Sequence, residues 1–262
     1  MKKLIKYFRI WWLMSRNSFM NVLFQRMAFM IFLVGKVLRF LMFFGFLFFL
    51  LKGTKNLAGY NLNQTIFFFL TFNFVDVVAQ FLFREVYRFR PLVVNGGFDL
   101  VLTKPMSALF RVLMGGADVV DLATIPPLIF AIYWVGNLFH PTPLQLVLFL
   151  FLLFNGLLIA TAFHIAVLGL GIITLEIDHS IMIYRDLSSL GRLPIDIYKE
   201  PLKSVLTFLV PVGIMVTLPA KALMGLVSPL GALASSLIGI LGIILAVRFW
   251  KFALTKYASA SS

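Results

Sequence analysis

The chain has 262 residues, of which 61% are hydrophobic and only 13% are charged, whereas soluble domains carry about 45–50% apolar and about 25% charged residues. This composition excludes an ordinary soluble core and predicts an all-α protein of the lipid bilayer. The absence of cysteine excludes disulfides, thiol catalysis and Cys-ligated metal sites. The net charge of +13 does not indicate nucleic acid, because lysine and arginine cluster at the ends of apolar runs, where a membrane protein meets anionic headgroups.

The N-terminal stretch, residues 1–26, predicts an amphipathic helix in the headgroup plane. Its apolar residues recur at near-helical spacing with lysine and arginine between them, and two tryptophans are present as interfacial anchors. The alternative is that this stretch is the cytoplasmic end of a long first span. We do not expect a cleaved signal peptide, because basic residues continue through Arg16.

A membrane-spanning helix needs about 20 mostly apolar residues. Five stretches have this length and composition: 27–51, 64–83, 109–137, 144–173 and 231–252. Together with one further crossing between the fourth and the last of them, they predict six transmembrane helices in a single domain, residues 1–262.

The position of that further crossing is open between two readings. In the first, 180–193 is a short, polar span and 203–225 is a re-entrant helical hairpin within an extracytoplasmic region, 194–230. The stretch 203–225 is interrupted by Pro211, Gly213 and Pro219. Proline breaks the backbone ladder, and broken helix at membrane depth is tolerated only inside protein or beside a wet cavity. In the second reading, 204–225 is the span and 176–203 is a cytoplasmic loop.

The distribution of basic residues predicts the orientation. With six spans, fourteen of the 23 lysines and arginines fall on one side, in the N-terminal segment, in the segment from Arg84 to Arg111 and in the C-terminal tail. Both termini and the segment 84–110 are therefore expected in the cytoplasm.

Five charges fall inside the predicted spans and form an expected intramembrane polar cluster: Lys36, Arg39, Asp76, Asp118 and Asp121. Each central charge costs about 2.5–3.5 kcal/mol on insertion scales, so these side chains should face one another or water. The two basic residues are three positions apart, as are the last two acids, so each pair shares a helix face. The cluster is either a structural ion-pair network or a site for a charged substrate or proton relay.

Catalytic and metal-binding motifs are missing from the chain. It has no phosphate-binding loop for ATP, no zinc-protease motif and no nucleophile elbow. Glu176, Asp178 and His179 offer metal-competent side chains, but a solvated helix end is the better interpretation. We therefore expect no catalytic residue, no metal and no cofactor in this chain.

A polar, punctuated stretch, "NGGFDLVLTKPMS", stands in the segment between the second and third spans. Gly96 and Gly97 permit a sharp turn, Asp99 suits the first turn of a helix, Lys104 suits its end, and Pro105 stops it.

The resulting helix would present Phe98, Val101 and Leu102, an apolar face that fits a hydrophobic groove on a partner. The alternative is a plain connecting loop packed on its own bundle.

The sequence resembles the type-2 ATP-binding-cassette (ABC) exporter permeases, the ABC-2 family transporter proteins. "NGGFDLVLTKPMSALFRVLMGGADVVD" is similar to the family's segment before the third span, where a glycine, an acid, leucines and a proline follow one another. "NVLFQRMAFM" resembles the family's first-span start, although Gln25 replaces the usual aromatic residue. "GRLPIDIYKEPLKSVLTFLVPVGIMVTLPAKALMG" resembles the proline-rich stretch of the family, with Pro201 displaced from its usual place.

The resemblance implies a permease subunit without catalytic activity of its own, in the cell (inner) membrane. It also implies two partners: a second permease subunit, identical or related, and a cytoplasmic ABC ATPase that holds ATP and Mg²⁺. The segment 84–110 would then contain the ATPase-coupling helix, with Gly97, Phe98, Asp99, Val101, Leu102, Lys104 and Pro105. The expected cargo is lipophilic or amphiphilic, exported from the cytoplasm or inner leaflet. The alternative is an ATP-independent channel, secondary transporter or membrane scaffold.

Overall fold

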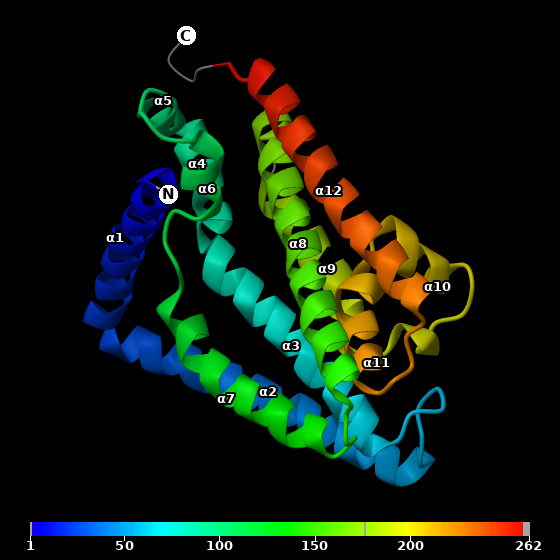
Figure 1. Ribbon diagram of the computed structural model, residues 1–262. Helices are drawn as coiled ribbons and strands as arrows, with labels where there is room; N and C mark the ends of the chain where they lie inside the picture. Colours follow the sequence, from blue (N-terminus) through cyan, green and yellow to red (C-terminus); the bar gives the residue numbers. More distant parts are fainter. Residues whose placement is uncertain (1, 176, 259–262) are drawn as a thin grey trace.

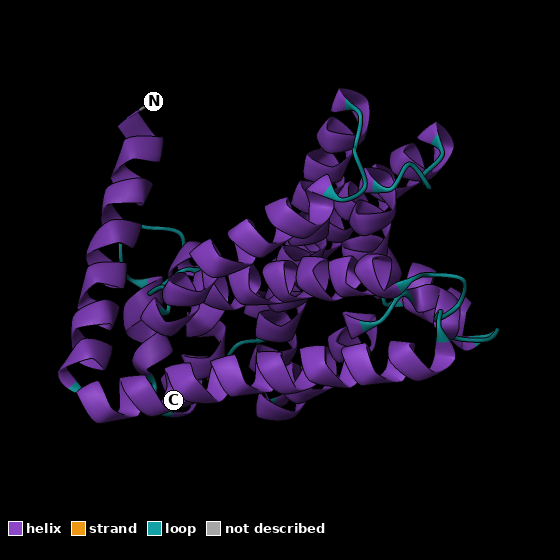
Figure 2. Cartoon of the chain, turned by 90° about the horizontal axis from the view of Figure 1, so that it is seen from below, coloured by secondary structure: helices purple, strands orange, loops and turns teal. Residues whose placement is uncertain are grey.

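The computed structural model describes residues 2–175 and 177–258, which form helices joined by short turns (Figure 2). Within these residues, five helices are long and apolar enough to cross a membrane. They are α2 (Arg26–Thr54), α3 (Leu62–Phe83), α7 (Val119–Asn137), α8 (Pro143–Thr174) and α12 (Pro229–Thr255). The second of these continues through η1 (Arg84–Arg88) and α4 (Phe89–Val94) as one long apolar stretch.

Shorter elements connect these five helices. They are α1 (Lys2–Phe24), α5 (Gly97–Leu102), α6 (Ala108–Leu113), α9 (Ile177–Ser189), η2 (Leu190–Arg192), η3 (Ile195–Ile197), α10 (Leu202–Ser204), the π-helical turns η4 (Val205–Leu209) and η5 (Gly213–Thr217), and α11 (Leu218–Leu223). The first of them, α1, is separated from α2 by a break at Gln25 and turns sharply away from it (Figure 1).

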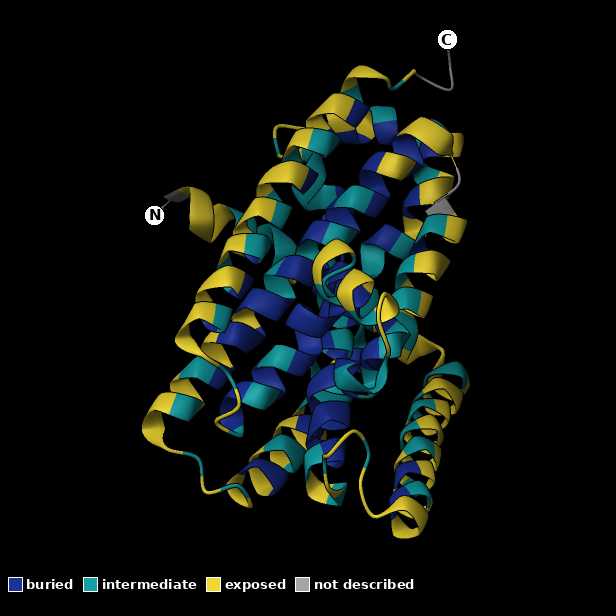
Figure 3. Ribbon diagram, turned by 90° about the vertical axis from the view of Figure 1, so that its right-hand side faces the viewer, coloured by how far each residue is buried: buried dark blue, intermediate teal, exposed yellow. Residues whose placement is uncertain are grey.

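The core is built around α3. Its phenylalanines Phe67 and Phe68 are almost completely buried, and 72% of its most apolar window is buried, against 6% for α2. Buried residues accordingly run through the middle of the molecule, while the outer helices expose most of their surface (Figure 3). An apolar helix that leaves its side chains uncovered suits a lipid environment, because lipid tails solvate such side chains as well as protein does.

Polar caps begin three long helices at the end of the bundle that lies away from α5, which we call the opposite end. Asn61 with Gln64 forms a capping box before α3, and Thr142 with Gln145 forms another before α8. The side chain of Ser228 caps α12. Each cap satisfies backbone N–H groups that the first helical turn leaves without partners.

The other end of the bundle, the α5 end, carries α4, α5, α6 and the end of α12 (Figure 1). Between residues 175 and 196 the chain passes from this end to the opposite one. At the α5 end, Arg90 Nε donates to the Leu175 carbonyl over 3.3 Å. At the opposite end, the Tyr60 hydroxyl donates to Asp196 over 2.9 Å. The passage is made by α9, η2 and η3, although α9 is too short to count as a span by length and composition.

The stretch 202–223 forms two arms that meet at an angle of 76°. Lys203, on the first arm, and Lys221, on the second, both pair with Asp196, at 3.0 and 2.6 Å. The two arms therefore begin and end at the same end of the bundle. By length and composition the bent pair is either a broken span or a re-entrant loop.

The third predicted span, 109–137, is not one helix, and this expectation is corrected. The chain forms α6, leaves helical geometry between Met114 and Asp118, and starts α7 afresh. Gly115 and Gly116 lie in the break, and a Cβ on Gly116 would lie 3.2 Å from the Cβ of Ser18 in α1. The break therefore has local causes, two adjacent glycines and the N-cap Asp118, and the backbone at Gly116 also lies close to α1.

Candidate functional site

Two regions concentrate the candidate residues: the segment around α5, and the charges between α2, α3 and α7. In the first, Gly96 takes a left-handed conformation with φ 71° and turns the chain from α4 into α5. Asp99 lies in the first turn of α5, Lys104 follows the last turn, and Pro105 lies beyond it. The six-residue helix therefore has the limits that its turn and cap residues predict.

The direction of its apolar face corrects the sequence-based expectation. Phe98 is 0% exposed and Val101 4%, so neither can be presented to a partner. The Phe98 ring instead packs against Phe89 and Tyr257, with ring centroids 5.2 and 5.1 Å away, and lies 6.3 Å from Trp250. The exposed apolar residues of α5 are Leu100, at 67%, and Leu102, at 42%.

A polar contact also joins α5 to the end of the chain's last helix. The Tyr257 hydroxyl donates to Asp99 Oδ1 over 2.9 Å. Burial, assisted by this hydrogen bond, raises the pKa of the Tyr257 phenol, so the phenol keeps the proton that it donates. Sequence reasoning missed Tyr257, because its distance of 158 positions from Asp99 gives no local signal.

Residues of α1 contact the segment that follows α5 through hydrogen bonds and a ring contact. The Ser107 N–H donates to the Tyr7 hydroxyl over 3.0 Å, and the Tyr7 ring meets Phe110 with centroids 4.7 Å apart. Further along, the Ala117 N–H donates to the fully buried Ser15 hydroxyl over 3.2 Å. Movement of α5 relative to the bundle must therefore also strain its connections to α1.

The five charges of the predicted polar cluster make separate direct contacts, although Asp76, Asp118 and Arg39 all lie close enough to Lys36 to act on its charge. Lys36 makes an ion pair with Asp121, which is 1% exposed. Asp118 pairs with Arg84, whose Nε lies 3.1 Å from its Oδ2. Asp76 accepts a hydrogen bond from Gln80 over 2.8 Å.

The helix break at residues 114–118 changes the setting of the two acids on α7. Asp118 is the N-cap of this helix and accepts from the backbone N–H groups of Val120 and Asp121. Asp121 lies in the first turn. Both carboxylates therefore lie at the positive end of a helix dipole, which stabilises negative charge, and not along a span interior as the pattern predicts. Sequence reasoning did not identify Arg84 as the partner of Asp118, because Arg84 follows the apolar run of α3 and lies far from Asp118 in the sequence.

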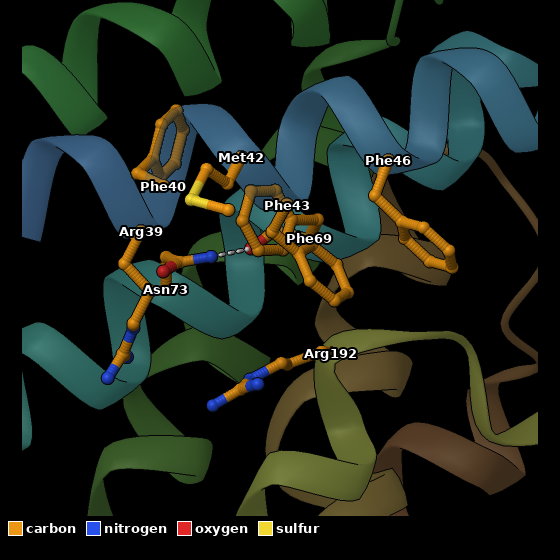
Figure 4. A pocket seen from close by; sticks show the side chains of 8 residues that line it. All are labelled: Arg39, Phe40, Met42, Phe43, Phe46, Phe69, Asn73 and Arg192. Atoms are coloured by element: carbon orange, nitrogen blue, oxygen red, sulfur yellow. Dashed lines mark hydrogen bonds between the residues drawn. The ribbon is translucent and has the colours of Figure 1, made fainter.

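Arg39 faces a pocket of about 290 Å³ between α2, α3 and η2 (Figure 4). Asn73 lies at its back and donates to the Phe69 carbonyl over 2.7 Å. The pocket is lined by Arg39, Phe40, Met42, Phe43, Phe46, Phe69, Asn73 and Arg192. Two guanidinium groups from distant parts of the sequence thus border one apolar cavity.

At the opposite end, Asp196 contacts both arms of the bent pair at 202–223 and Tyr60 in the turn before α3. Burial alone would raise the pKa of this carboxyl, but hydrogen bonds from Lys221, Lys203 and Tyr60 outweigh burial and lower the pKa to about 2. Burial and the hydrogen bond to Asp196 raise the pKa of the Tyr60 phenol. The cluster therefore combines a carboxylate with two cations and a neutral phenol at neutral pH.

The described residues contain no group of three His, Asp or Glu side chains that could hold a metal ion. Of the acidic stretch considered in the sequence, Glu176 lies outside the described residues. Asp178 lies 3.8 Å from Arg90 in an exposed ion pair.

The architecture defines a helical membrane protein with five apolar helices of spanning length in its described part, and a sixth if the bent pair counts as one. A family model described as "ABC-2 family transporter protein" matches residues 37–261. The match covers most of the chain, so the protein belongs to the ABC-2 family of transporter permeases. No curated protein and no solved structure matches the chain.

Proposed function

We propose that this chain is the transmembrane subunit of an ABC exporter, driven by a separate cytoplasmic ATPase. The family match over residues 37–261 carries the proposal, and the absence of a phosphate-binding loop from the sequence agrees with an ATPase on another chain. Two such subunits, identical or related, would enclose the pathway. The cargo would be lipophilic or amphiphilic and would leave the cytoplasm or inner leaflet.

The α5 end would face the cytoplasm and receive the ATPase. Its support is the charge distribution, since the basic N-terminal segment, the segment 84–110 and the C-terminal tail all belong to this end. The α1 helix would lie in the headgroup plane, because Leu4, Phe8 and Trp12 are all more than half exposed.

On this orientation the fifth crossing is made by α9 and η2, and the bent pair at 202–223 is a re-entrant hairpin on the outer side. The common pairing of Lys203 and Lys221 with Asp196 supports this arrangement. The α9 helix is short for a span, but a broken and partly polar crossing is tolerated when protein surrounds it.

The contact with the ATPase would use Leu100, Leu102 and Lys104, the exposed residues of and just after α5. Phe98 and Asp99 would have a different role. They anchor α5 to Trp250 and Tyr257, so that closure of the ATPase dimer on ATP binding displaces α5 and α12 together. The spans would then rearrange and release the cargo outward.

The test begins with the protein purified in mild detergent from its native membranes. Co-purifying chains are labelled with 8-azido-ATP, which reacts with nucleotide-binding subunits on illumination. We expect one labelled partner with the wild type and its loss in the Leu100→Asp/Leu102→Asp variant, because a hydrophobic groove rejects two carboxylates. Leu226→Asp places one such carboxylate on an exposed leucine at the opposite end and is the control.

A wild type that brings down no labelled chain would favour the ATP-independent alternative. Equal labelling of the partner in all three preparations would leave the ATPase in place but remove α5 as its contact.

A further inference from the structure

The pocket between α2, α3 and η2 has one wall of aromatic rings and a cationic rim. Phe43, Phe46 and Phe69 supply apolar surface, and Arg39 and Arg192 border the same cavity (Figure 4). Such a combination of a broad apolar wall with a few placed polar groups is the usual composition of a small-molecule site.

Neither arginine makes a direct ion pair within the part of the chain that the structure describes. Asp76 is close enough to act on the charge of Arg192, but it makes no ion pair with it. Lys36, one turn before Arg39 on the same helix, contrasts with them because it is paired with Asp121. The positive charge at this pocket is thus not neutralised by a carboxylate in direct contact.

Arg192 is held in place by rings. Its guanidinium carbon lies 5.8 Å from the centroid of Phe43 and 5.8 Å from that of Phe72. Stacking on aromatic faces uses the plane of the guanidinium and leaves its in-plane N–H groups free to donate, which suits bidentate recognition of an oxyanion. Asn73 adds a side-chain amide at the back of the pocket.

We propose that this pocket binds an anionic amphiphile, whose phosphate or carboxylate head meets Arg39 and Arg192 and whose chain lies on the phenylalanine wall. An anion would neutralise both guanidinium groups, whereas a cation would be repelled and a neutral lipid would leave them without a partner. The inference rests on the proposed function, since it narrows the amphiphilic cargo to an anionic one.

The probe is radiolabelled dodecyl phosphate, and equilibrium binding is measured on the full-length protein with its co-purified partner in a neutral maltoside detergent. We expect saturable binding that weakens by about tenfold or more in Arg39→Gln and in Arg192→Gln, since each removes a charge-assisted hydrogen bond. Arg39→Lys keeps the charge without the planar fork and should fall in between. Arg26→Gln, an exposed arginine at the start of α2, is the matched control and should bind as the wild type does.

The competitors decide which part of the ligand is recognised. Dodecyltrimethylammonium should not compete; equal binding of this cation would overturn the proposal. Inorganic phosphate should compete only weakly, and displacement at concentrations equal to the probe would overturn the amphiphile in favour of a free anion. Unchanged binding in both glutamine variants, with monodisperse elution as the check on folding, would also overturn it.

Lipid extraction distinguishes two sources of such a ligand. A phospholipid retained by the wild type and lost from the Arg39→Gln/Arg192→Gln variant would support the site with a membrane lipid as its occupant. A site that is free of lipid on purification and takes up the probe would support it with a transient ligand.

Labelling with 8-azido-ATP on the same preparations separates the two claims. No probe binding with the ATPase still attached would defeat only this inference. Probe binding by a wild type without any ATPase would defeat only the proposed function.

Discussion

Phe98 lies where the α5 segment joins the last helix, and its ring is enclosed by Phe89, Trp250 and Tyr257. We expect Phe98→Ala to lower the free energy of unfolding by about 3–5 kcal/mol, because it removes a buried ring and leaves a cavity. The measurement is the midpoint of thermal unfolding in detergent. Leu100→Ala, on the exposed side of the same helix, should change stability by about 0.5 kcal/mol or less. Equal losses in the two variants would contradict the inward direction of Phe98.

The Lys36–Asp121 pair separates a structural from a functional role of the intramembrane charges. Lys36→Met leaves the carboxylate of Asp121 buried without its cation. Because the Lys36 side chain is 34% exposed, we expect a loss of about 2–3 kcal/mol, below the ~3–5 kcal/mol of a fully buried pair.

The double variant Lys36→Met/Asp121→Asn should recover much of that loss, since no unpaired charge remains. Lys52→Met, at the far end of the same helix, is the control. A double variant that is stable but inactive in transport would favour a functional role, and one that is stable and active would favour the structural role.

Both arms of the bent pair at 202–223 contact Asp196, whose pKa in the folded protein is about 2 against an ordinary value of 3.8. A lowered pKa means that the folded state holds its proton less tightly than the unfolded chain does. The contribution of this carboxylate to stability is therefore complete above pH 3.8 and is lost as the pH falls through about 2.

We expect the unfolding midpoint of the wild type to drop in this pH window and the drop to be smaller in Asp196→Asn. Asp186→Asn, at an exposed aspartate, leaves the Asp196 cluster intact and should keep the wild-type pH dependence. The same pH dependence in both variants would remove Asp196 as its cause.

The α6–α7 break and the burial of α5 illustrate what a sequence pattern can and cannot predict about elements. Hydropathy alone places α2, α3, α8 and α12, since bilayer thickness requires about 20 apolar residues regardless of tertiary contacts. It does not reveal the break between α6 and α7, which is signalled instead by the glycine pair Gly115-Gly116 and by the N-cap Asp118. Likewise the limits of α5 follow from Gly96, Asp99 and Pro105, but a short apolar face can turn toward its own bundle or a partner with equal ease.

Some of the site residues can be predicted from the sequence, and others cannot. The acids on α7 and Lys36 are conspicuous in a sequence because charge is rare in an apolar run. The partner of Asp118 is Arg84. The pocket brings together Arg39 and Arg192, which lie 153 positions apart in the sequence. Such pairings depend on how helices pack, and no local spacing encodes them.

The topology of the whole molecule can be tested because the chain has no cysteine. Single cysteines are introduced by Leu100→Cys, Lys199→Cys and Leu226→Cys, all at exposed positions, and labelled with a membrane-impermeant maleimide in intact cells. We expect labelling at 199 and 226 but not at 100, since in the proposed topology α9 and η2 cross the membrane before residue 199. Labelling that groups 199 with 100 would instead support 204–225 as the fifth span.

The continuity of α12 has a mechanical consequence. Its 27 residues form one helix of about 40 Å, which begins after Ser228 and ends at Thr255, two residues before Tyr257. A helix resists a change in length, so we expect a displacement of α5 to reach Ser228 as tilt or axial sliding of α12. Along its path, Asn155 of α8 donates to the carbonyl and hydroxyl of Ser235 over 2.9 Å. This contact between Asn155 and Ser235 would be the point about which α12 tilts, and its position would set which end of the helix moves further.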